Sequence, residues 1–342
     1  MNETDGKILE VVGQKKKFEH EIFDHIYIAE KLQILRQRDL VAYTGPRNYY
    51  LIGAGAELEQ ALVQYTLSKL QSKNFTLMTT PNIIRDGVFE GAGLEAGKMD
   101  EMVYSIKGTE RNFSLAGTSE IGLCAYFANQ SIPHKYLPLK LCCISTCYRK
   151  ETGSRLDPRG LFRVHQFQKV EMFGVTANET GTESQELHEE FVSIQKELYQ
   201  DLGLHFNVVD MPSGDLGLPA YRKIDIEAWF PGRNKYDEIS SASNCTEFQT
   251  SRLQIIYEKD KKFKYAHTVN ATACAAQRLI IALLENGQQA NKTVALPDCL
   301  VPFMYGKKII KFVKPWTMKY IGPKLSHKKH VTPADILYGS EE

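Results

Sequence analysis

The sequence lacks several features that would assign a protein to a class at once. Its 42 basic and 41 acidic side chains leave a net charge of +1, so charge alone indicates neither a nucleic-acid binder nor a partner of an acidic surface. No apolar run reaches the length of about 20 residues that a membrane-spanning helix needs. The seven cysteines include no CxxC pair, the common zinc spacing, so we expect reduced and mostly buried thiols.

The ends of the chain also show little that is distinctive. The first residues, MNETDGKILEVVGQ, are acidic and resemble neither an apolar secretion signal nor an Arg-rich transit peptide. We expect residues 1–21 to be a tail or linker remnant, residues 22–322 to form one domain, and residues 323–342 to be a tail that is first basic and then acidic. With 43% hydrophobic and 24% charged residues, the chain has the composition of an ordinary folded domain.

The hydrophobic periodicity predicts an α+β fold. Helical spacing occurs over residues 22–38, 53–75 and 183–203, and the nearly all-apolar stretch 271–288 predicts a buried helix. Residues 88–106 carry glycines and both signs of charge, which indicates a loop. Short strand-like runs fill much of the rest, so we expect a mostly antiparallel sheet flanked by helices. These runs are residues 49–53, 76–84, 140–151, 161–174, 205–212, 221–231, 235–244, 252–258 and 262–270.

One predicted hairpin, TCYRKETGSRLDPRGLFRVHQFQKVEMFG at residues 146–174, carries unlike charges among apolar neighbours. Because side chains alternate along a strand, Arg149 shares a face with Glu151, and Arg163 shares one with Phe167 and Glu171. Guanidinium groups bind phosphate, an aromatic ring stacks on a base, and carboxylates accept from amines. The face therefore suits ATP beside an amino acid. A cross-strand ladder of ion pairs on a solvated face is the alternative.

Further motifs decide between these readings. GTSE at 117–120, the hairpin, DEISSASNCTEFQ at 237–249 and HTVNATACAAQRLIIALLENGQQ at 267–289 follow one another in the order found in class II aminoacyl-tRNA synthetases. They resemble the seryl-tRNA synthetases in particular, and residues 58–84 resemble motif 1 of that family, with Pro81 at its proline. The NATAC form of motif 3 and the YIGPK stretch resemble the animal mitochondrial branch.

The resemblance implies a serine–tRNA ligase with a class II catalytic domain over residues 22–322. Such an enzyme makes seryl-adenylate from serine and ATP and then charges tRNA(Ser), here in the mitochondrial matrix. Arg149 would hold the α-phosphate, Arg278 would meet the γ-phosphate, and Phe167 would stack on adenine. Together with Glu238, the two arginines would be the catalytic residues. The implied ATP-binding residues are Arg149, Lys150, Glu151, Val164, Phe167, Glu238, Ile239, Ser240, Ser241 and Arg278.

The same resemblance implies the remaining ligands. Glu238 and Ser241 would hold Mg²⁺ against the ATP phosphates. A homodimer formed through motif 1 is also implied, with no membrane contact. The implied serine-binding residues are Thr118, Ser119, Glu120, Arg149, Glu171, Asn270 and Thr272. A helix N-cap with an acidic first turn also accounts for Thr118 and Glu120, and the two roles are compatible.

The sequence departs from the family pattern in several places. Ala271 and Ala273 replace two motif 3 glycines, and Ser251 stands where an arginine is common. No sustained heptad pattern supplies the family's coiled-coil arm, which leaves open a fragment, an isoform or an armless protein. Residues 302–333 are basic and contain Trp316, which fits either an RNA phosphate track or a solvated tail.

Two further functions remain as alternatives. A catalytically silent paralog could serve as a binding partner, although the charged residues that such proteins lose are present here. An armless ligase could instead load an amino acid onto a carrier protein. Enzymes of that kind use zinc with cysteine ligands, and Cys245 and Cys274 lie in the relevant motifs.

Overall fold

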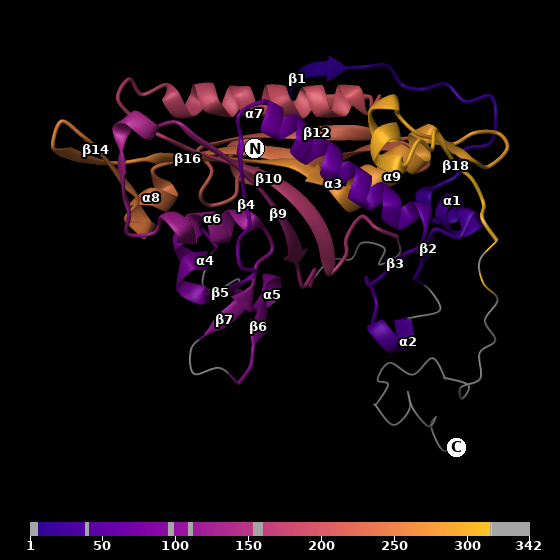
Figure 1. Ribbon diagram of the computed structural model, residues 1–342, viewed down its shortest axis with the longest axis horizontal. Helices are drawn as coiled ribbons and strands as arrows, with labels where there is room; N and C mark the ends of the chain where they lie inside the picture. Colours follow the sequence, from indigo (N-terminus) through magenta and orange to yellow (C-terminus); the bar gives the residue numbers. More distant parts are fainter. Residues whose placement is uncertain are drawn as a thin grey trace.

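The frame of the molecule is one eight-stranded sheet. The computed structural model describes residues 6–37, 41–94, 99–108, 112–152, 160–314 and residue 316. The strand order is β1-β11-β12-β13-β16-β10-β9-β4, and every neighbouring pair is antiparallel except β4 with β9 (Figure 1). The strands are β1 (Lys7–Val12), β4 (Thr76–Met78), β9 (Leu139–Tyr148), β10 (Gln166–Thr176), β11 (Phe206–Asp210), β12 (Arg222–Phe230), β13 (Lys235–Thr246) and β16 (His267–Ala275).

Three long helices cover one face of this sheet: α3 (Ala54–Ser72), α7 (Glu183–Asp201) and α9 (Ala276–Gly287). Helix α7 packs tightly against the sheet at Gly174, where an added Cβ would lie 2.3 Å from a Leu187 methyl carbon. Val170 and Met172 have the same parity as Gly174 and are fully buried in this core. The opposite face of β10 therefore carries Phe167, Lys169 and Glu171.

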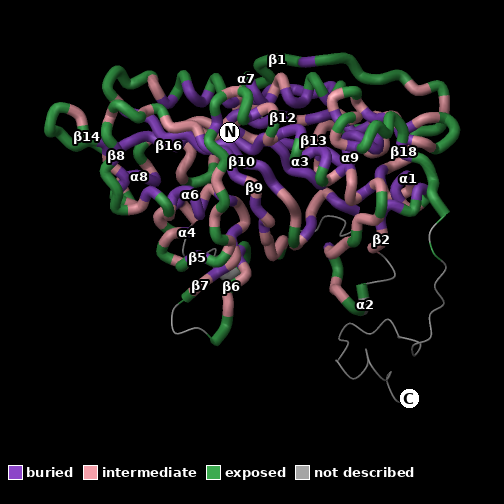
Figure 2. The backbone as a smooth tube through the Cα atoms, viewed as in Figure 1, coloured by how far each residue is buried: buried purple, intermediate pink, exposed green. Residues whose placement is uncertain are grey.

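The other face is covered only in part. At one end, α4 (Asp86–Ala92), α6 (Ser119–Phe127) and α8 (Phe248–Leu253) form a second core around Phe173 and Val175. A small sheet of β5 (Ile83–Arg85), β6 (Tyr104–Ile106) and β7 (Phe113–Leu115) lies below α6 (Figure 1). Purple tubes in Figure 2 mark the buried central strands, whereas the edge strand β1 is mostly exposed and green. The middle of this face holds the cavity described below.

Short elements complete the fold. The hairpin of β14 (Ile256–Lys259) and β15 (Lys262–Tyr265) pairs with β8 (Ser131–Pro133) at one end of the molecule. The others are α1 (His25–Leu32), β2 (Leu35–Arg36), α2 (Val41–Thr44), β3 (Tyr50–Leu51), α5 (Met99–Met102), β17 (Val294–Ala295), β18 (Ile309–Ile310), and 3-10 turns at His134–Tyr136, Ser213–Asp215 and Asp298–Met304.

The structure confirms the α+β architecture and all the long helices, but it corrects several segments. Residues 7–12 are not part of a tail, because they pair with β11 as an edge strand. The helix expected over 22–38 ends at Leu32, since Gln33 takes a left-handed conformation that stops it. The two hairpin arms are shorter than expected, and residues 88–106 contain α4, α5 and β6 rather than only loop.

The remaining expectations concern the cysteines, the membrane and the C-terminal tail. All seven cysteines are free thiols, and six of them are buried, as expected. Among the described residues, no helix combines the length and apolarity required to cross a membrane. The predicted tail, residues 323–342, lies outside the described residues, as does most of the basic stretch 302–333. Trp316 is described and is 72% exposed.

Candidate active site

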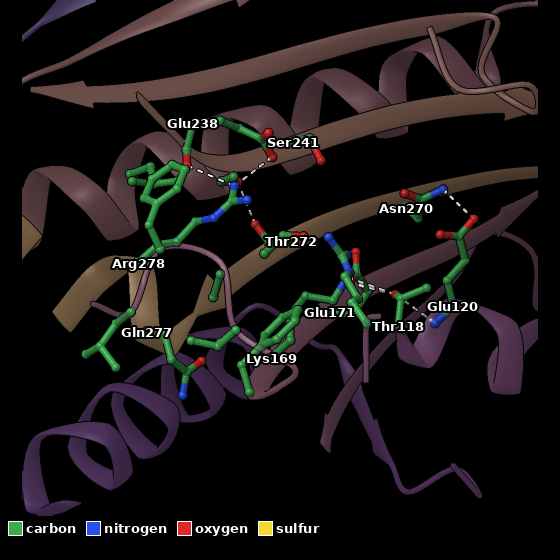
Figure 3. Close-up of a pocket in the computed structure, with 18 of the residues that line it drawn as sticks. Thr118, Glu120, Lys169, Glu171, Glu238, Ser241, Asn270, Thr272, Gln277 and Arg278 are labelled. Atoms are coloured by element: carbon green, nitrogen blue, oxygen red, sulfur yellow. Dashed lines mark hydrogen bonds and ion pairs between the residues drawn. The ribbon is translucent and has the colours of Figure 1, made fainter. Parts of the chain in front are cut away.

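A cavity of about 220 Å³ lies on the open face of the sheet, between β10, β13, β16, the loop before α6 and the start of α9. Figure 3 shows how the labelled side chains from these elements converge on it. All the predicted site residues line this cavity except Ser119 and Lys150, which lie beside it. The sequence analysis did not predict six other lining residues: Leu161, Phe162, Lys169, Ser243, Ala275 and Gln277.

The predicted phosphate-binding arginine lies where the hairpin continues past the ends of its strands. Arg149 pairs with His165 through backbone hydrogen bonding, with a distance of 2.9 Å from its nitrogen to the His165 oxygen. The Arg149 guanidinium donates to the Gly117 carbonyl at 3.4 Å and lies 5.2 Å from the centre of the Phe167 ring. A cation and an aromatic ring thus stand side by side, an arrangement that suits a nucleotide.

Glu151 is held by a second charge. Arg163 donates to its Oε2 at 3.1 Å. Glu151 itself has a φ of 50°, a left-handed conformation that turns the chain away from the sheet. The sequence analysis placed Arg163 on the face of Phe167 and Glu171, but β10 begins only at Gln166. The ion pair therefore belongs to the rim of the cavity.

One end of the cavity contains a buried ion pair. Lys169 and Glu171 lie two residues apart on β10, and their side chains are only 8% and 2% exposed. Lys169 Nζ forms an ion pair with Glu171 Oε2 and donates to Thr118 Oγ1 at 2.8 Å. Thr118 Oγ1 lies 3.3 Å from Glu171 Oε2, and as N-cap of α6 it also accepts from the Glu120 amide. Thr118 is thus the N-cap that the sequence predicts, and it also lines the cavity.

A second carboxylate, Glu120, faces the same space from the first turn of α6. Its Oε1 accepts from Gln249 Nε2 at 2.6 Å and from Asn270 Nδ2 at 3.0 Å. Burial, and next the negative charge of Glu171, raise the pKa of Glu120 to about 7. Two carboxylates in one small cavity create a strong demand for a cationic ligand.

Arg278 enters the other end of the cavity from the first turn of α9. Its Nη1 lies 3.2 Å from Glu238 Oε1 and donates to the Glu238 carbonyl at 2.9 Å. Its guanidinium also lies 4.8 Å from the centre of the Phe162 ring. Partial burial opposes ionisation of Glu238, but the positive charges of Arg278, Lys223 and Arg149 outweigh it and lower the pKa of this carboxyl group. Glu238 is therefore ionised at neutral pH.

An irregularity in β13 brings Glu238 and Ser241 to the same cavity. Ser240 pairs with Ile226 and Glu238 with Glu227, so Ile239 is an extra residue in β13. In a regular strand, positions three apart point to opposite faces, and one bulged residue restores a shared face. The Ser240 hydroxyl points the other way and donates to the Thr272 carbonyl at 2.7 Å.

The oxygen atoms of Glu238 and Ser241 suit a hard cation. The Glu238 side chain is 40% exposed and negatively charged, and Ser241 adds a neutral oxygen. Among the described residues, no cluster of three His, Cys, Asp or Glu side chains could hold a metal by itself. Glu238 and Ser241 alone are a sparse set of ligands. Such a set fits Mg²⁺, which keeps waters and binds phosphate oxygens beside one or two protein ligands.

The cysteines proposed as zinc ligands do not come together. Cys245 accepts from Asn270 at 3.5 Å beside the cavity. Cys274 lies against Thr66 of α3, on the helix-covered face of the sheet. Burial raises the pKa of both thiols, which disfavours the thiolate that zinc requires. The arrangement does not favour the carrier-protein ligase.

The residues that stand in place of the family's two glycines and one arginine fit the local packing. Ala271 and Ala273 are buried in the core beneath the sheet, where methyl groups fill space. The Ser251 hydroxyl donates to the Phe248 carbonyl within its own helix. It does not line the cavity.

The chain is similar to class II tRNA synthetases, and to serine–tRNA ligases in particular. The tRNA synthetase class II core domain (G, H, P, S and T) matches residues 104–287. The mitochondrial serine–tRNA ligase of Mus musculus is 48% identical over 330 residues, which are 96% of this chain and 63% of that protein. The serine–tRNA ligase of Treponema denticola is 40% identical over 89% of this chain and 72% of its own length. The chain thus spans 63% of the length of its mouse relative.

Two solved structures resemble the fold. The cytoplasmic serine–tRNA ligase from Naegleria fowleri in complex with AMP has a TM-score of 0.86 at 33% identity, over 92% of this chain and 74% of that one. The seryl-tRNA synthetase from Pyrococcus horikoshii complexed with ATP has a TM-score of 0.87 at 34% identity, with the same coverage.

Proposed function

Because this chain belongs to the serine–tRNA ligases, a family of class II aminoacyl-tRNA synthetases, we propose that it activates serine with ATP and transfers it to tRNA(Ser). One observation carries the proposal: a single cavity joins two arginines at one end to a buried carboxylate, Glu171, and a partly buried one, Glu120, at the other. The arginines suit a polyphosphate and the carboxylates suit an ammonium and a hydroxyl group. Such a cavity can hold ATP and serine end to end.

In the first step, the serine carboxylate attacks the α-phosphorus of ATP, and pyrophosphate leaves as the P–O bond breaks. No side-chain nucleophile is needed, so catalysis comes from positioning and charge neutralisation. We assign the α-phosphate to Arg149 and the γ-phosphate to Arg278. Phe167 would stack on adenine, with Val164 and Glu151 at its edge. Lys150, Ile239 and Ser240 would contribute through their backbone, since the Ser240 hydroxyl is used elsewhere.

Serine would bind between Thr118, Glu120, Glu171, Asn270 and Thr272. A site built to hydrogen-bond a hydroxyl group rejects alanine, because its buried polar atoms would be left unpaired. Ser119 lies outside the lining, and its role would be limited to the α6 N-terminus. Mg²⁺ held by Glu238 and Ser241 would neutralise phosphate charge when bound.

The partners and the location are part of the proposal. In the second step, a hydroxyl group at the 3′ end of tRNA(Ser) attacks the serine carbonyl carbon, and AMP leaves. We propose a homodimer through motif 1, which is supported by the position of β4 at the sheet edge with Leu77 43% exposed. The mitochondrial matrix is proposed because two mammalian relatives are named as mitochondrial.

The test is serine-dependent exchange of pyrophosphate into ATP, with alanine, glycine and threonine as competing amino acids. We expect exchange with serine alone, and a loss of at least about hundredfold in Arg149→Met, since it removes a charge that stabilises the transition state. Arg222→Met is the matched control, because Arg222 pairs with Asp210 at 2.9 Å outside the cavity. A folded protein without exchange for any amino acid would favour the silent paralog.

A further inference from the structure

Lys169 is a buried cation within the amino-acid pocket that the motif comparison did not select. Its ammonium group contacts Thr118 and Glu171, and both residues are assigned to serine. A buried lysine is costly unless it is paired, so its presence in a ligand cavity needs a reason. Figure 3 shows Lys169 close to Glu171 and Thr118.

The two carboxylates of the pocket are anchored in different ways. Glu171 Oε2 receives the Lys169 ammonium and the Thr118 hydroxyl, whereas Glu120 Oε1 receives two neutral amides. Within the described part of the chain, no protein group donates a hydrogen bond to the second oxygen of either carboxylate, Glu171 Oε1 or Glu120 Oε2. Each thus presents one oxygen to a ligand, but only Glu171 has its charge cancelled by a fixed cation.

The charge balance explains why the cancellation matters. Two uncompensated carboxylates in so small a space repel each other, and one of them would take up a proton. With Lys169 in place, Glu120, Glu171 and Lys169 together carry one net negative charge. This charge matches the single ammonium group of an amino acid. The hydroxyl of Thr118 is also oriented, because its oxygen accepts from Lys169 and from the Glu120 amide, which leaves its hydrogen to donate to Glu171.

We propose, on the basis of the proposed function, that Lys169 is a positioning residue that fixes Glu171 and Thr118 and sets the net charge of the serine pocket. It acts through these two residues and needs no contact with serine. A mutation that removes its charge should therefore impair serine binding far more than ATP binding, since Arg149, Phe167 and Arg278 stay in place.

The pH profile gives a second readout. The groups around Glu120 are Glu171 and Lys169 of β10, Cys124 of α6, Cys245 of β13, and the neutral amides of Gln249 and Asn270. Burial raises the pKa of both thiols, which therefore stay neutral. Lys169 lowers the pKa of Glu120, so removal of its charge should raise this pKa. The pH at which serine binding reaches half its maximum should then move upward.

The experiment compares Lys169→Met, Lys169→Gln and Lys169→Arg in the full chain. We expect both neutral variants to raise KM for serine at least about tenfold, the loss of roughly one charge-assisted hydrogen bond, with KM for ATP within about twofold. Lys169→Arg should keep the wild-type pH midpoint. Lys140→Met is the matched control. Lys140 lies on the neighbouring strand β9, outside the cavity, and pairs with Glu190 of α7 at 2.9 Å.

Each outcome decides the matter. Serine and ATP constants that rise together, an unchanged serine KM, or an unchanged pH midpoint would overturn the proposal. So would neutral variants that both fail to fold, because the pair would then serve stability alone. Exchange by the wild type is measured in the same series: if it is absent for serine, the proposed function fails, whereas normal wild-type exchange with unaffected variants refutes only the role of Lys169.

Discussion

Glu120, which we propose as a serine ligand, has a raised pKa, so we expect pH to control the pocket at the scale of one residue. Burial and the charge of Glu171 raise its pKa to about 7, so the carboxyl group is protonated below that pH and ionised above it. The serine ammonium needs the ionised form. Serine binding should therefore weaken as the pH falls through about 7.

We expect kcat/KM for serine to drop about tenfold for each pH unit below this value, while KM for ATP stays nearly constant. Measurements of pyrophosphate exchange from pH 5.5 to 8.5 check this expectation. Glu120→Gln, which cannot ionise, is the control and should remove the pH step together with most of the serine affinity. A step that persists in Glu120→Gln would assign the titration to another group.

Most of the residues that line the cavity could be predicted, because the family motifs specify their type and order. Lys169 and Gln277 could not, although each had a signal in the sequence. Lys169 has the parity of Phe167 and Glu171 on β10, and Gln277 is a polar residue beside Arg278 in an apolar helix. Gln277 Nε2 donates to Tyr49 and to Glu59, both at 2.6 Å, so it connects α9 with α3.

At the scale of the element, the β13 bulge is a feature that alternation along a strand cannot reveal. The regular strand that the sequence predicts over residues 235–244 would place Glu238 and Ser241 on opposite faces. A second register shift, on β16 between Cys274 and Thr272, lies beside Glu171. Long helices were predictable from their period, and β1 was not, because its side chains are almost all exposed.

Deletion of Ile239 tests the role of the bulge. We expect β13 to become a regular strand in which Glu238 and Ser241 lie two positions apart and both stay on the cavity face. Serine-dependent exchange should therefore fall by less than about tenfold, because the pairing with β12 is unchanged. Exchange and Mg²⁺ dependence are measured together with circular dichroism. Ile239→Val keeps the extra residue and should retain full activity. A loss of about hundredfold in the deletion variant would instead show that the bulge itself positions these two side chains.

At the scale of the whole molecule, β1 closes one edge of the central sheet. Only Val12 of this strand is buried, and Glu10 adds a surface ion pair with Lys196 at 2.5 Å. The strand nevertheless covers the backbone groups of β11, which would otherwise be open to pairing with another chain.

Removal of residues 1–12 should therefore affect solubility more than activity. We expect Tm to fall by about 2–6 °C, since little apolar area is lost, and light scattering to rise with protein concentration. Ile8→Lys is the control: it changes a side chain that is 53% exposed and leaves the strand in place. Unchanged light scattering in the truncated chain would show that β11 does not need a pairing strand to prevent its association with other chains.

The residues that line the cavity are spread widely along the chain, so the cavity can form only late in translation. The cavity takes side chains from residues 118–120, 149–171, 238–243 and 270–278. The first of these segments leaves the ribosome long before Arg278 does, and pairing of β10 with β16 must wait for residues 267–275. Contacts between such distant segments slow folding. A nascent chain interrupted before α9 should thus expose an incomplete, charged pocket, which makes translation of this region the interval at greatest need of chaperone protection.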